Sequence, residues 1–373
     1  MNITLVSSSL TKGGAERVVA SLAQGLSAAQ HSVSIVVKHE RSDQEYDPGE
    51  RVQVIRLPER SARRLHLWKR FGNAFSRRLD LRRAILDTNP DVVVAFTTIM
   101  NVRVLLALRG VNVPVVVSER NNPNMVKVKL KWRVLRRLTY SNASLLVSLS
   151  RGVDGCFDWM PAPKRAVIYN PLPLDISTTL GEERALVLSP SSRYFVACGR
   201  LEHQKGFDLL IEAFASIARD LPQWELVILG EGSQRNSLSG QAIAHQIQDR
   251  LHLPGRVANP VAYFASCDVF VLSSRFEGFG NVILEAMYAG LPVVGFDCEY
   301  GPSEIIESGV NGFLVESGSI TALAAAMSDL AKDEAMRLRI ASQARERVSD
   351  FANATIIAQW ISTLESIATC TKE

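Results

Sequence analysis

The sequence predicts an α/β fold in which two doubly wound parallel sheets face each other across a cleft. Short β-branched runs alternate with longer amphipathic segments along the 373 residues, as in repeated βαβ units. The alternation restarts after a proline-containing stretch, and proline fits neither sheet nor helix interiors. We therefore expect an N-terminal domain at 1–170, a linker at 171–190 and a C-terminal domain at 191–351.

The first domain shows one strand signal after another, each followed by a longer segment of mixed polarity. Runs of β-branched and apolar residues predict strands at 2–7, 32–38, 52–57, 91–96, 113–118 and 144–148. Amphipathic segments predict helices at 15–29, 63–87, 100–109, 126–140 and 150–159. The segment 126–140 begins with Lys alternating with apolar residues, which also fits a strand.

The second domain repeats the cycle. Its strands are expected at 194–199, 224–229, 269–273 and 292–296. Its helices are expected at 206–219, 234–247, 281–290, 319–331 and 333–349. A last amphipathic segment at 352–369 has no strand after it. It could pack on either domain, and we expect it to pack on the N-terminal domain.

The composition, 47% hydrophobic and 21% charged, is typical of a soluble globular protein. No apolar run approaches the ~20 residues that span a bilayer. The N-terminus predicts a first strand and not a signal peptide. The five cysteines form no C-x-x-C pair, so we expect reduced thiols in the cytoplasm and no metal site.

The net charge of +4 hides a strong asymmetry. Residues 1–170 carry 27 Lys and Arg against 13 Asp and Glu, a net +14, whereas the remainder carries 15 against 25, a net −10. An N-terminal half this basic predicts an anionic partner, which is a membrane surface, a phosphorylated lipid or nucleic acid.

The most informative segment is Glu277-Gly278-Phe279-Gly280-Asn281-Val282-Ile283-Leu284-Glu285. It follows a predicted strand, and a glycine turn leading into a helix presents free N–H groups and a positive dipole end, which suit phosphate. A carboxylate beside a phosphate site is unfavourable unless it binds hydroxyl groups. We therefore predict that Glu277 and Glu285 bind the ribose and sugar hydroxyl groups of a nucleotide-sugar.

A second loop follows the strand at 194–199 and carries Arg200 and Lys205. Ligands of parallel sheets lie outside the carboxyl ends of the strands, so both cations are expected beside Glu277. There they would neutralise a diphosphate leaving group without a metal. Either cation taken alone also fits a solvated loop charge. His203 lies in the same loop and is the one histidine that we would test.

With these residues in place, the chain resembles glycosyltransferase family 4. The resemblance covers nearly the whole chain and implies the GT-B fold of two Rossmann-like domains, like that of bacterial transferases for lipid-linked glycans or lipopolysaccharide. It rests on the motif Gly199-Arg200-Leu201-x-x-x-Lys205-Gly206, on Gly230-Glu231-Gly232, on the segment 277–285, on Gly13-Gly14-Ala15-Glu16-Arg17 and on Tyr169-Asn170-Pro171.

The resemblance implies a role for each motif residue. Arg200 and Lys205 bind the donor diphosphate, Glu285 the ribose hydroxyl groups and Glu277 the transferred sugar, and the nucleobase lies near 254–257. The implied donor-binding residues are Gly14, Arg200, Lys205, Gly230, Arg256, Glu277, Gly278, Phe279, Gly280, Asn281, Val282 and Glu285. The candidate catalytic residues are Glu277, Arg200, Lys205, Arg120 and Glu119.

The resemblance also implies sugar transfer from a nucleotide-sugar with retained anomeric configuration and without an obligatory metal, and the chain has no Asp-x-Asp motif. We expect a UDP-sugar carrying a hexose or N-acetylhexosamine, no further cofactor, and a lipid-linked glycan acceptor (polyprenyl-diphosphate oligosaccharide or lipopolysaccharide). Two alternatives stay open. One is a nucleotide-sugar epimerase of the GT-B fold, and the other is a non-catalytic binding subunit.

Two segments of the first domain are expected to face the cleft. Gly13-Gly14 follows the first strand, where backbone can approach a phosphate or the acceptor, and a plain helix-entry turn is the alternative. Several family members place a histidine at the end of another strand, where this chain has Glu119, Arg120 and Asn121. Which of the three acts there stays open, and Asn121 or Asn122 also fits a helix cap.

Two basic stretches account for the charge of the first domain. Residues 60–83 carry nine basic residues and one acid, with Trp68, Phe71, Phe75 and Leu79 at helical spacing. That pattern is typical of a helix lying in a membrane interface, although an ordinary surface helix also fits. The expected acceptor and membrane contacts are Arg63, Arg64, Trp68, Lys69, Arg70, Lys127, Lys129, Lys131 and Arg133. No nucleic-acid recognition module accompanies the charge, so we expect a peripheral protein on the inner face of the cytoplasmic membrane.

Overall fold

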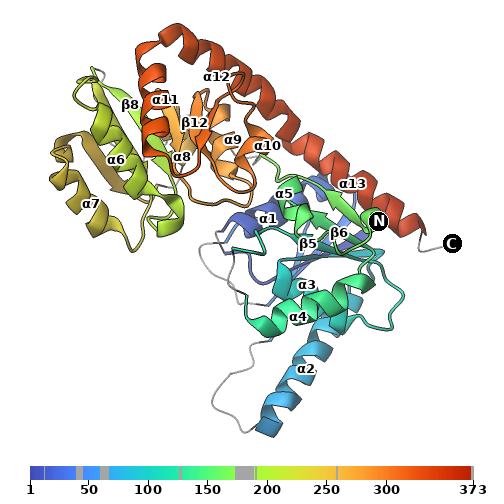
Figure 1. Ribbon diagram of the computed structural model, residues 1–373. Coiled ribbons are helices and arrows are strands. Elements are labelled where there is room, and N and C mark those ends of the chain that lie inside the picture. Colours follow the sequence, from blue (N-terminus) through green and yellow to red (C-terminus); the bar gives the residue numbers. More distant parts are fainter. Residues whose placement is uncertain are drawn as a thin grey trace. The chain divides into compact units, whose positions relative to one another are not determined.

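The computed structural model describes residues 1–11, 13–38, 45–58, 67–125, 128–172, 189, 191–257 and 259–370. The chain divides into two compact units. The N-terminal unit comprises Met1–Pro173 and Ala352–Glu373, and the C-terminal unit comprises Leu174–Phe351. Each unit has its own parallel sheet with helices packed on it (Figure 1), which confirms the predicted pair of doubly wound α/β domains.

The N-terminal unit contains a seven-stranded sheet in the order β3-β2-β1-β4-β5-β6-β7, with all neighbours parallel. Its strands are β1 (Asn2–Ser7), β2 (Ser32–Val37), β3 (Gln53–Arg56), β4 (Val92–Phe96), β5 (Val115–Glu119), β6 (Leu145–Ser148) and β7 (Arg165–Val167). Its helices are α1 (Gly14–Ala28), α2 (Leu67–Leu86), α3 (Thr98–Ala107), α4 (Leu130–Thr139), α5 (Arg151–Gly155) and α13 (Asn353–Cys370). The strand order reverses between β1 and β4.

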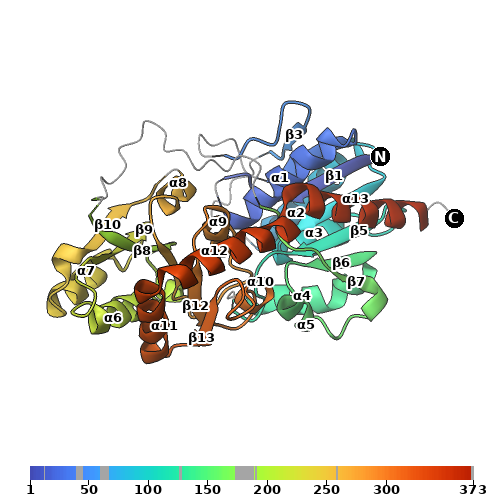
Figure 2. The same cartoon turned by 90° about the horizontal axis from the view of Figure 1, so that it is seen from above.

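The last helix, α13, completes the N-terminal unit, although the sequence left its partner open (Figure 2). It packs against α1, where Ile357 lies so close to Gly25 that a Cβ there would be 2.5 Å from it. Trp360 is fully buried and its ring lies 6.4 Å from that of Phe96 in β4. Burial of so large an aromatic side chain contributes several kcal/mol, at about 25 cal/mol per Å² of apolar surface.

The C-terminal unit contains a six-stranded parallel sheet in the order β10-β9-β8-β11-β12-β13. Its strands are β8 (Arg193–Cys198), β9 (Trp224–Leu229), β10 (Leu251–Gly255), β11 (Val269–Leu272), β12 (Val293–Asp297) and β13 (Phe313–Glu316). Its helices are α6 (Phe207–Ile217), α7 (Arg235–Ala244), α8 (Pro260–Phe264), α9 (Asn281–Tyr288), α10 (Pro302–Ile305), α11 (Ile320–Lys332) and α12 (Glu334–Val348). Here the strand order reverses between β8 and β11.

The sequence missed several short elements: β7, β10, β13, α8 and α10. The three strands lie at sheet edges, where one side is unpaired and the burial signal is weak. Pro254 within β10 is tolerated there because an edge strand need not donate every N–H group. In the ambiguous segment at 126–140, the described residues 128–140 contain a helix, α4, and no strand.

Candidate active site

The strand order of the C-terminal sheet reverses between β8 and β11, and in parallel sheets ligands bind at the carboxyl ends of strands at such a point. The loops at 199–206 and 273–280 leave β8 and β11 there. Ser273 Oγ donates to the carbonyl oxygen of Lys205 at 2.9 Å, and Gln204 Nε2 donates to that of Phe276 at 3.1 Å. The two loops are thus held together by direct hydrogen bonds.

Lys205 and Glu277 meet where these loops join. Lys205 Nζ lies 2.7 Å from Glu277 Oε1, and Ser274 Oγ donates to the same oxygen at 2.7 Å. The side chains of Lys205 and Glu277 are 17% and 9% exposed, so water screens the pair little. Ser274, which the sequence did not single out, completes the cluster.

Arg275 links the same loops to α6. Its guanidinium forms two hydrogen bonds with the carboxylate of Asp208 in α6, at 2.8 and 2.6 Å, and a third with the carbonyl oxygen of His203. The hydrogen bonds from Arg275 hold the pKa of Asp208 below its usual range. The exposed His203 therefore contributes its backbone to the loop.

Two thiols, the half-buried Cys198 and the buried Cys298, lie near the Lys205–Glu277 pair. Burial raises the pKa of Cys198, the last residue of β8, to about 12, with Glu285 adding to the rise and Lys205 opposing it. Burial likewise raises the pKa of Cys298 to about 12, with a contribution from Glu277 and opposition from Lys205. Lys205, Glu277 and Glu285 therefore act on one small region at the ends of β8 and β12.

The helix α9 begins at this region and presents its N-terminus there. Gly280 is its N-cap residue, with φ of +93°, a conformation that strongly favours glycine. Having no side chain, Gly280 provides no cap to the amides of Asn281 and Val282 in the first turn. Phe279 is buried against Phe351, with ring centroids 5.7 Å apart, and Glu285 is 6% exposed. Gly278 lies between Glu277 and Phe279.

The other residues of this unit that were predicted to bind the donor nucleotide-sugar differ in exposure. Arg200 and Arg256 are exposed, and neither guanidinium forms a hydrogen bond or ion pair with another described residue. Gly230 follows β9 directly, and a Cβ there would lie 1.9 Å from the carbonyl oxygen of Gly199. The structure thus brings Lys205, Glu277 and Ser274 together and leaves the two guanidinium groups in solvent.

In the N-terminal unit, Gly14 lies at the corresponding reversal point, after β1. It is the first residue of α1 and is exposed. Gly13 is the N-cap residue, and a Cβ on it would lie 2.5 Å from Glu16 Oε2. A side chain at position 13 would therefore crowd the flexible end of the Glu16 side chain, which can move aside.

Glu119 does not face solvent, contrary to the expected placement. It is 1% exposed, and both carboxylate oxygens accept a hydrogen bond from Thr98 Oγ1 at 3.0 Å. Tyr140 donates a further hydrogen bond to it. Burial raises the pKa of Glu119. Neither Tyr140 nor Thr98 could be identified from local pattern, because each lies 21 residues from Glu119 in the chain.

Arg120 is also buried, at 4% exposed. It donates to Ser118 Oγ at 2.7 Å, to the carbonyl oxygen of Ile168 at 3.1 Å and to Asn170 Oδ1 at 3.0 Å, and it stacks on Trp360. Burial lowers its pKa to about 9. The structure thus places Arg120, like Glu119, in the interior of its unit, and a catalytic role for either stays a prediction.

Asn121 and Asn122 follow directly. Asn121 is exposed, whereas Asn122 is buried and its Oδ1 accepts a hydrogen bond from the backbone amide of Asn124 at 2.9 Å. That contact forms a turn, and the next described helix begins only at Leu130. The alternative of a helix cap is therefore not what the structure shows.

The predicted acceptor and membrane residues are only partly described. Lys129, Lys131 and Arg133 are exposed at the start of α4. Trp68, Lys69 and Arg70 lie in the first turn of α2. Arg63, Arg64 and Lys127 lie outside the described residues.

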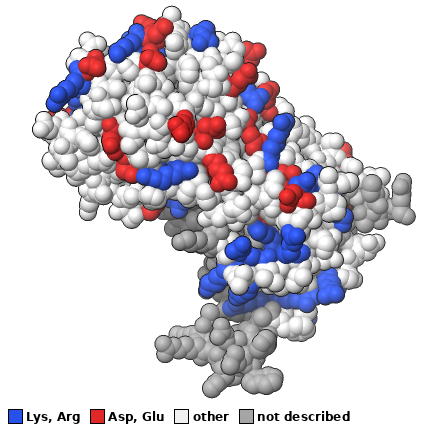
Figure 3. Space-filling model, in the orientation of Figure 1, with Lys and Arg blue, Asp and Glu red and all other residues white. Residues whose placement is uncertain are grey.

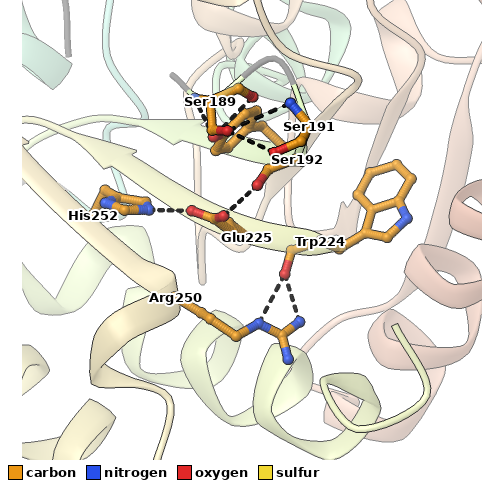
Figure 4. A network of polar contacts seen from close by, with 8 residues as sticks. Ser189, Ser191, Ser192, Trp224, Glu225, Arg250 and His252 are labelled. Atoms are coloured by element: carbon orange, nitrogen blue, oxygen red, sulfur yellow. Dashed lines mark hydrogen bonds and ion pairs between the residues drawn. The ribbon is translucent and has the colours of Figure 1, made fainter. Parts of the chain in front are cut away.

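A second polar network lies in the C-terminal sheet, at the amino ends of its strands (Figure 4). His252 Nε2 and Ser192 Oγ each lie 2.5 Å from a carboxylate oxygen of Glu225, and Arg250 Nε donates to the carbonyl oxygen of Trp224 at 3.0 Å. These residues lie at the amino ends of β8, β9 and β10. The network therefore stabilises the edge away from the predicted ligand side.

No described helix is both long enough and apolar enough to cross a bilayer. The described residues also include no cluster of three or more His, Cys, Asp or Glu side chains arranged to hold a metal ion.

The chain is similar to known proteins along nearly its whole length. It is 27% identical over 371 residues to a GalNAc-alpha-(1->4)-GalNAc-alpha-(1->3)-diNAcBac-PP-undecaprenol alpha-1,4-N-acetyl-D-galactosaminyltransferase of Campylobacter jejuni, covering 98% of this chain and 99% of the relative. It is 26% identical to a second Campylobacter jejuni enzyme, the N-acetylgalactosamine-N,N'-diacetylbacillosaminyl-diphospho-undecaprenol 4-alpha-N-acetylgalactosaminyltransferase, over 92% of this chain and 93% of that enzyme.

Solved structures share the fold. The crystal structure of Anabaena Alr3699/HepE in complex with UDP has a TM-score of 0.82 at 22% identity and covers 98% of this chain and 100% of that one. Sucrose-phosphate synthase from Thermosynechococcus elongatus has a TM-score of 0.81 at 20% identity, with 99% of both chains covered.

Two glycosyltransferase family models match the chain, one in each unit. Residues 13–172 match the Glycosyl transferase 4-like domain, and residues 182–347 match Glycosyl transferases group 1. The second match contains Arg200, Lys205, Glu277 and Glu285. With one domain of each kind in this order, the chain belongs to the glycosyltransferase family that its motifs predicted.

Proposed function

We propose that this glycosyltransferase moves a hexose or N-acetylhexosamine from a UDP-sugar to a lipid-linked glycan, with retained anomeric configuration. The observation that carries the proposal is the Lys205–Glu277 pair beside the N-terminus of α9. An ammonium and a helix N-terminus suit a diphosphate. The carboxylates of Glu277 and Glu285 suit the hydroxyl groups of the sugar and the ribose.

The chemistry assigned to these residues is a front-side displacement. The bond between C1 of the sugar and the diphosphate oxygen breaks, and the acceptor hydroxyl oxygen forms a bond to C1 on the same face. The acceptor proton passes to the departing diphosphate. Lys205, with Arg200, neutralises the charge that develops on that leaving group, so the step is proposed to need no metal.

The acceptor proposal rests on the curated relatives. The two Campylobacter jejuni enzymes are named for undecaprenyl-diphosphate-linked acceptors, and they cover nearly the whole chain. An acceptor of that kind is anionic and lies in a membrane, which fits the basic N-terminal half of this chain. We therefore place the enzyme peripherally on the cytoplasmic face of the membrane. UDP as the donor nucleotide is supported by the UDP complex of the HepE structure.

The test begins with the donor. Purified protein is screened by thermal shift against UDP-, GDP- and ADP-sugars, since a ligand at about 100 times its Kd raises stability by about 2.7 kcal/mol. UDP-sugars are expected to raise the melting temperature and the others are not. A panel in which no UDP-sugar binds would overturn the donor assignment.

The reaction is then followed as UDP release with and without a polyprenyl-diphosphate oligosaccharide. Release only with the acceptor, an α-linked product by NMR and an unchanged rate in EDTA are expected. Conversion of the nucleotide-sugar without any acceptor would instead identify an epimerase. Binding of the donor with no reaction on any acceptor would favour a non-catalytic subunit.

A further inference from the structure

Helix α4 carries an apolar edge that the N-terminal unit leaves uncovered. Leu130, Val134 and Leu138 are spaced by four residues and therefore lie along one face of the helix. They are 71%, 49% and 66% exposed. Single exposed leucines are common, whereas three aligned on one ten-residue helix mark a contact surface.

Basic side chains border this edge. Lys129, Lys131, Arg133 and Arg137 are exposed, and α4 contains no acidic residue. Helix α3, on which α4 packs, contains none either. Within the described chain, Lys129, Lys131 and Arg133 form no ion pair with a carboxylate. Figure 3 shows Lys and Arg gathered on the face that α4 covers.

Two tryptophans lie beside cations in and around α4. Trp132 and Trp159 are half-buried. Arg103 and Lys131 each lie 5.3 Å from the Trp132 ring, and Arg137 lies 4.4 Å from that of Trp159. Half-buried tryptophans beside cations are typical of the boundary between headgroups and acyl chains.

Helix α2 repeats the pattern beside α3. Phe75 and Leu79 are spaced by four residues and are 62% and 36% exposed, and Arg78 between them is exposed. Both α2 and α4 pack on α3.

We propose that α4 is the membrane-docking element, with Leu130, Val134 and Leu138 inserted at the acyl boundary of an anionic bilayer and the bordering Lys and Arg on the lipid phosphates. Charge complementarity selects this occupant. A second copy docked through the same face would bring these cations against their own counterparts, with no acid on α3 or α4 to offset them. The proposal gives the membrane partner of the proposed function a residue-level site, and its test needs no sugar transfer.

The experiment is flotation of the full chain with phosphatidylglycerol or phosphatidylcholine vesicles at low salt. The wild type is expected to float with phosphatidylglycerol and not with phosphatidylcholine. The variant L130S/V134S/L138S keeps every charge and is expected to bind at least about tenfold more weakly. The matched control I243S/L338S removes two equally exposed apolar side chains from the C-terminal unit, 64% and 66% exposed, and is expected to bind as the wild type does.

Two further measurements separate the electrostatic part of binding from the insertion of side chains into the bilayer. The variant K129Q/K131Q/R133Q is expected to bind more weakly and with a shallower dependence on salt. Brominated lipid is expected to quench the tryptophan fluorescence of the wild type. The quenching is expected to be weaker in W132F. Melting curves of all variants establish that they are folded.

Three outcomes would overturn the proposal. They are a wild type that does not float with phosphatidylglycerol, a folded L130S/V134S/L138S variant that floats like the wild type, and a lipid-free dimer by light scattering that this variant abolishes. The last would assign the apolar edge to a second copy. Failure of the donor or acceptor assays with intact vesicle binding would instead count against the proposed reaction alone.

Discussion

The ammonium of Lys205 lies 2.7 Å from Oε1 of Glu277, although 72 residues separate them in the chain. The contact joins the loop after β8 to the loop after β11, at the point where the strand order of the sheet reverses. Ser274 holds the same carboxylate oxygen. A cation and a carboxylate fixed side by side can bind the two chemically different ends of a nucleotide-sugar, the diphosphate and the sugar hydroxyl groups.

Replacement of Lys205 by Met should slow transfer. The methionine keeps most of the apolar stem and removes the charge that stabilises the leaving diphosphate, so kcat should fall roughly 10²–10³-fold, as on loss of one oxyanion donor. Steady-state kinetics with saturating donor measure it. Lys332→Met, which removes an exposed lysine of α11, is the control. A Lys205→Met rate within tenfold of the wild type would contradict the role.

Replacement of Glu285 by Gln should weaken donor binding more than it slows the chemical step. A hydrogen bond to a charged group contributes about 1.5–3 kcal/mol, so the Kd for UDP should rise roughly 10- to 100-fold. Isothermal titration with UDP measures the change. Glu212→Gln, at an exposed position of α6, should leave the Kd unchanged. Equal affinities for UDP in the wild type and Glu285→Gln would rule out the ribose assignment.

Replacement of Gly230 by Ala should destabilise the C-terminal unit. The new Cβ would lie 1.9 Å from the carbonyl oxygen of Gly199, at a φ of +141°, so backbone must move at a cost of about 1–3 kcal/mol or more. Gly240 in α7 has no atom within 4 Å of a Cβ, and Gly240→Ala should stabilise the helix by about 0.5–1 kcal/mol. Urea unfolding of both variants tests this contrast, and equal effects would refute it.

Replacement of Glu119 by Gln should change the pH dependence of stability. Burial raises the folded-state pKa of Glu119 above its unfolded value of about 4.3. Its contribution to stability is therefore fully present below that unfolded pKa and is lost as pH rises through the folded pKa. The free energy of unfolding of the wild type, relative to Glu119→Gln, should fall between acidic and neutral pH.

Urea unfolding at a series of pH values measures this difference. Its slope cannot exceed about 1.36 kcal/mol per pH unit for one group. Glu212→Gln, the same substitution at an exposed position of α6, is measured in parallel as the control. If the difference in unfolding free energy between the wild type and Glu119→Gln does not change with pH, burial does not raise the pKa of Glu119.

The sequence determined the parts of this protein that depend on local pattern. Continuous apolar runs such as Val92–Phe96 specify buried parallel strands wherever they pack. The spacing of Glu277, Gly280 and Glu285 specifies a turn and a helix start, and in the structure α9 begins at Asn281 after the loop that follows β11. The basic segment at 126–140 was predicted as a helix with a strand as the alternative, and it contains α4.

Which residues far apart in the chain come into contact was settled by the packing of the elements. It buried Glu119 against Thr98 and Tyr140, and it placed Trp360 of α13 in the core of the N-terminal unit. It added the edge strands and left Leu130, Val134 and Leu138 uncovered. The physical reason is that burial and pairing depend on the packing of elements far apart in the chain, and local side-chain periodicity specifies an apolar face without specifying what covers it.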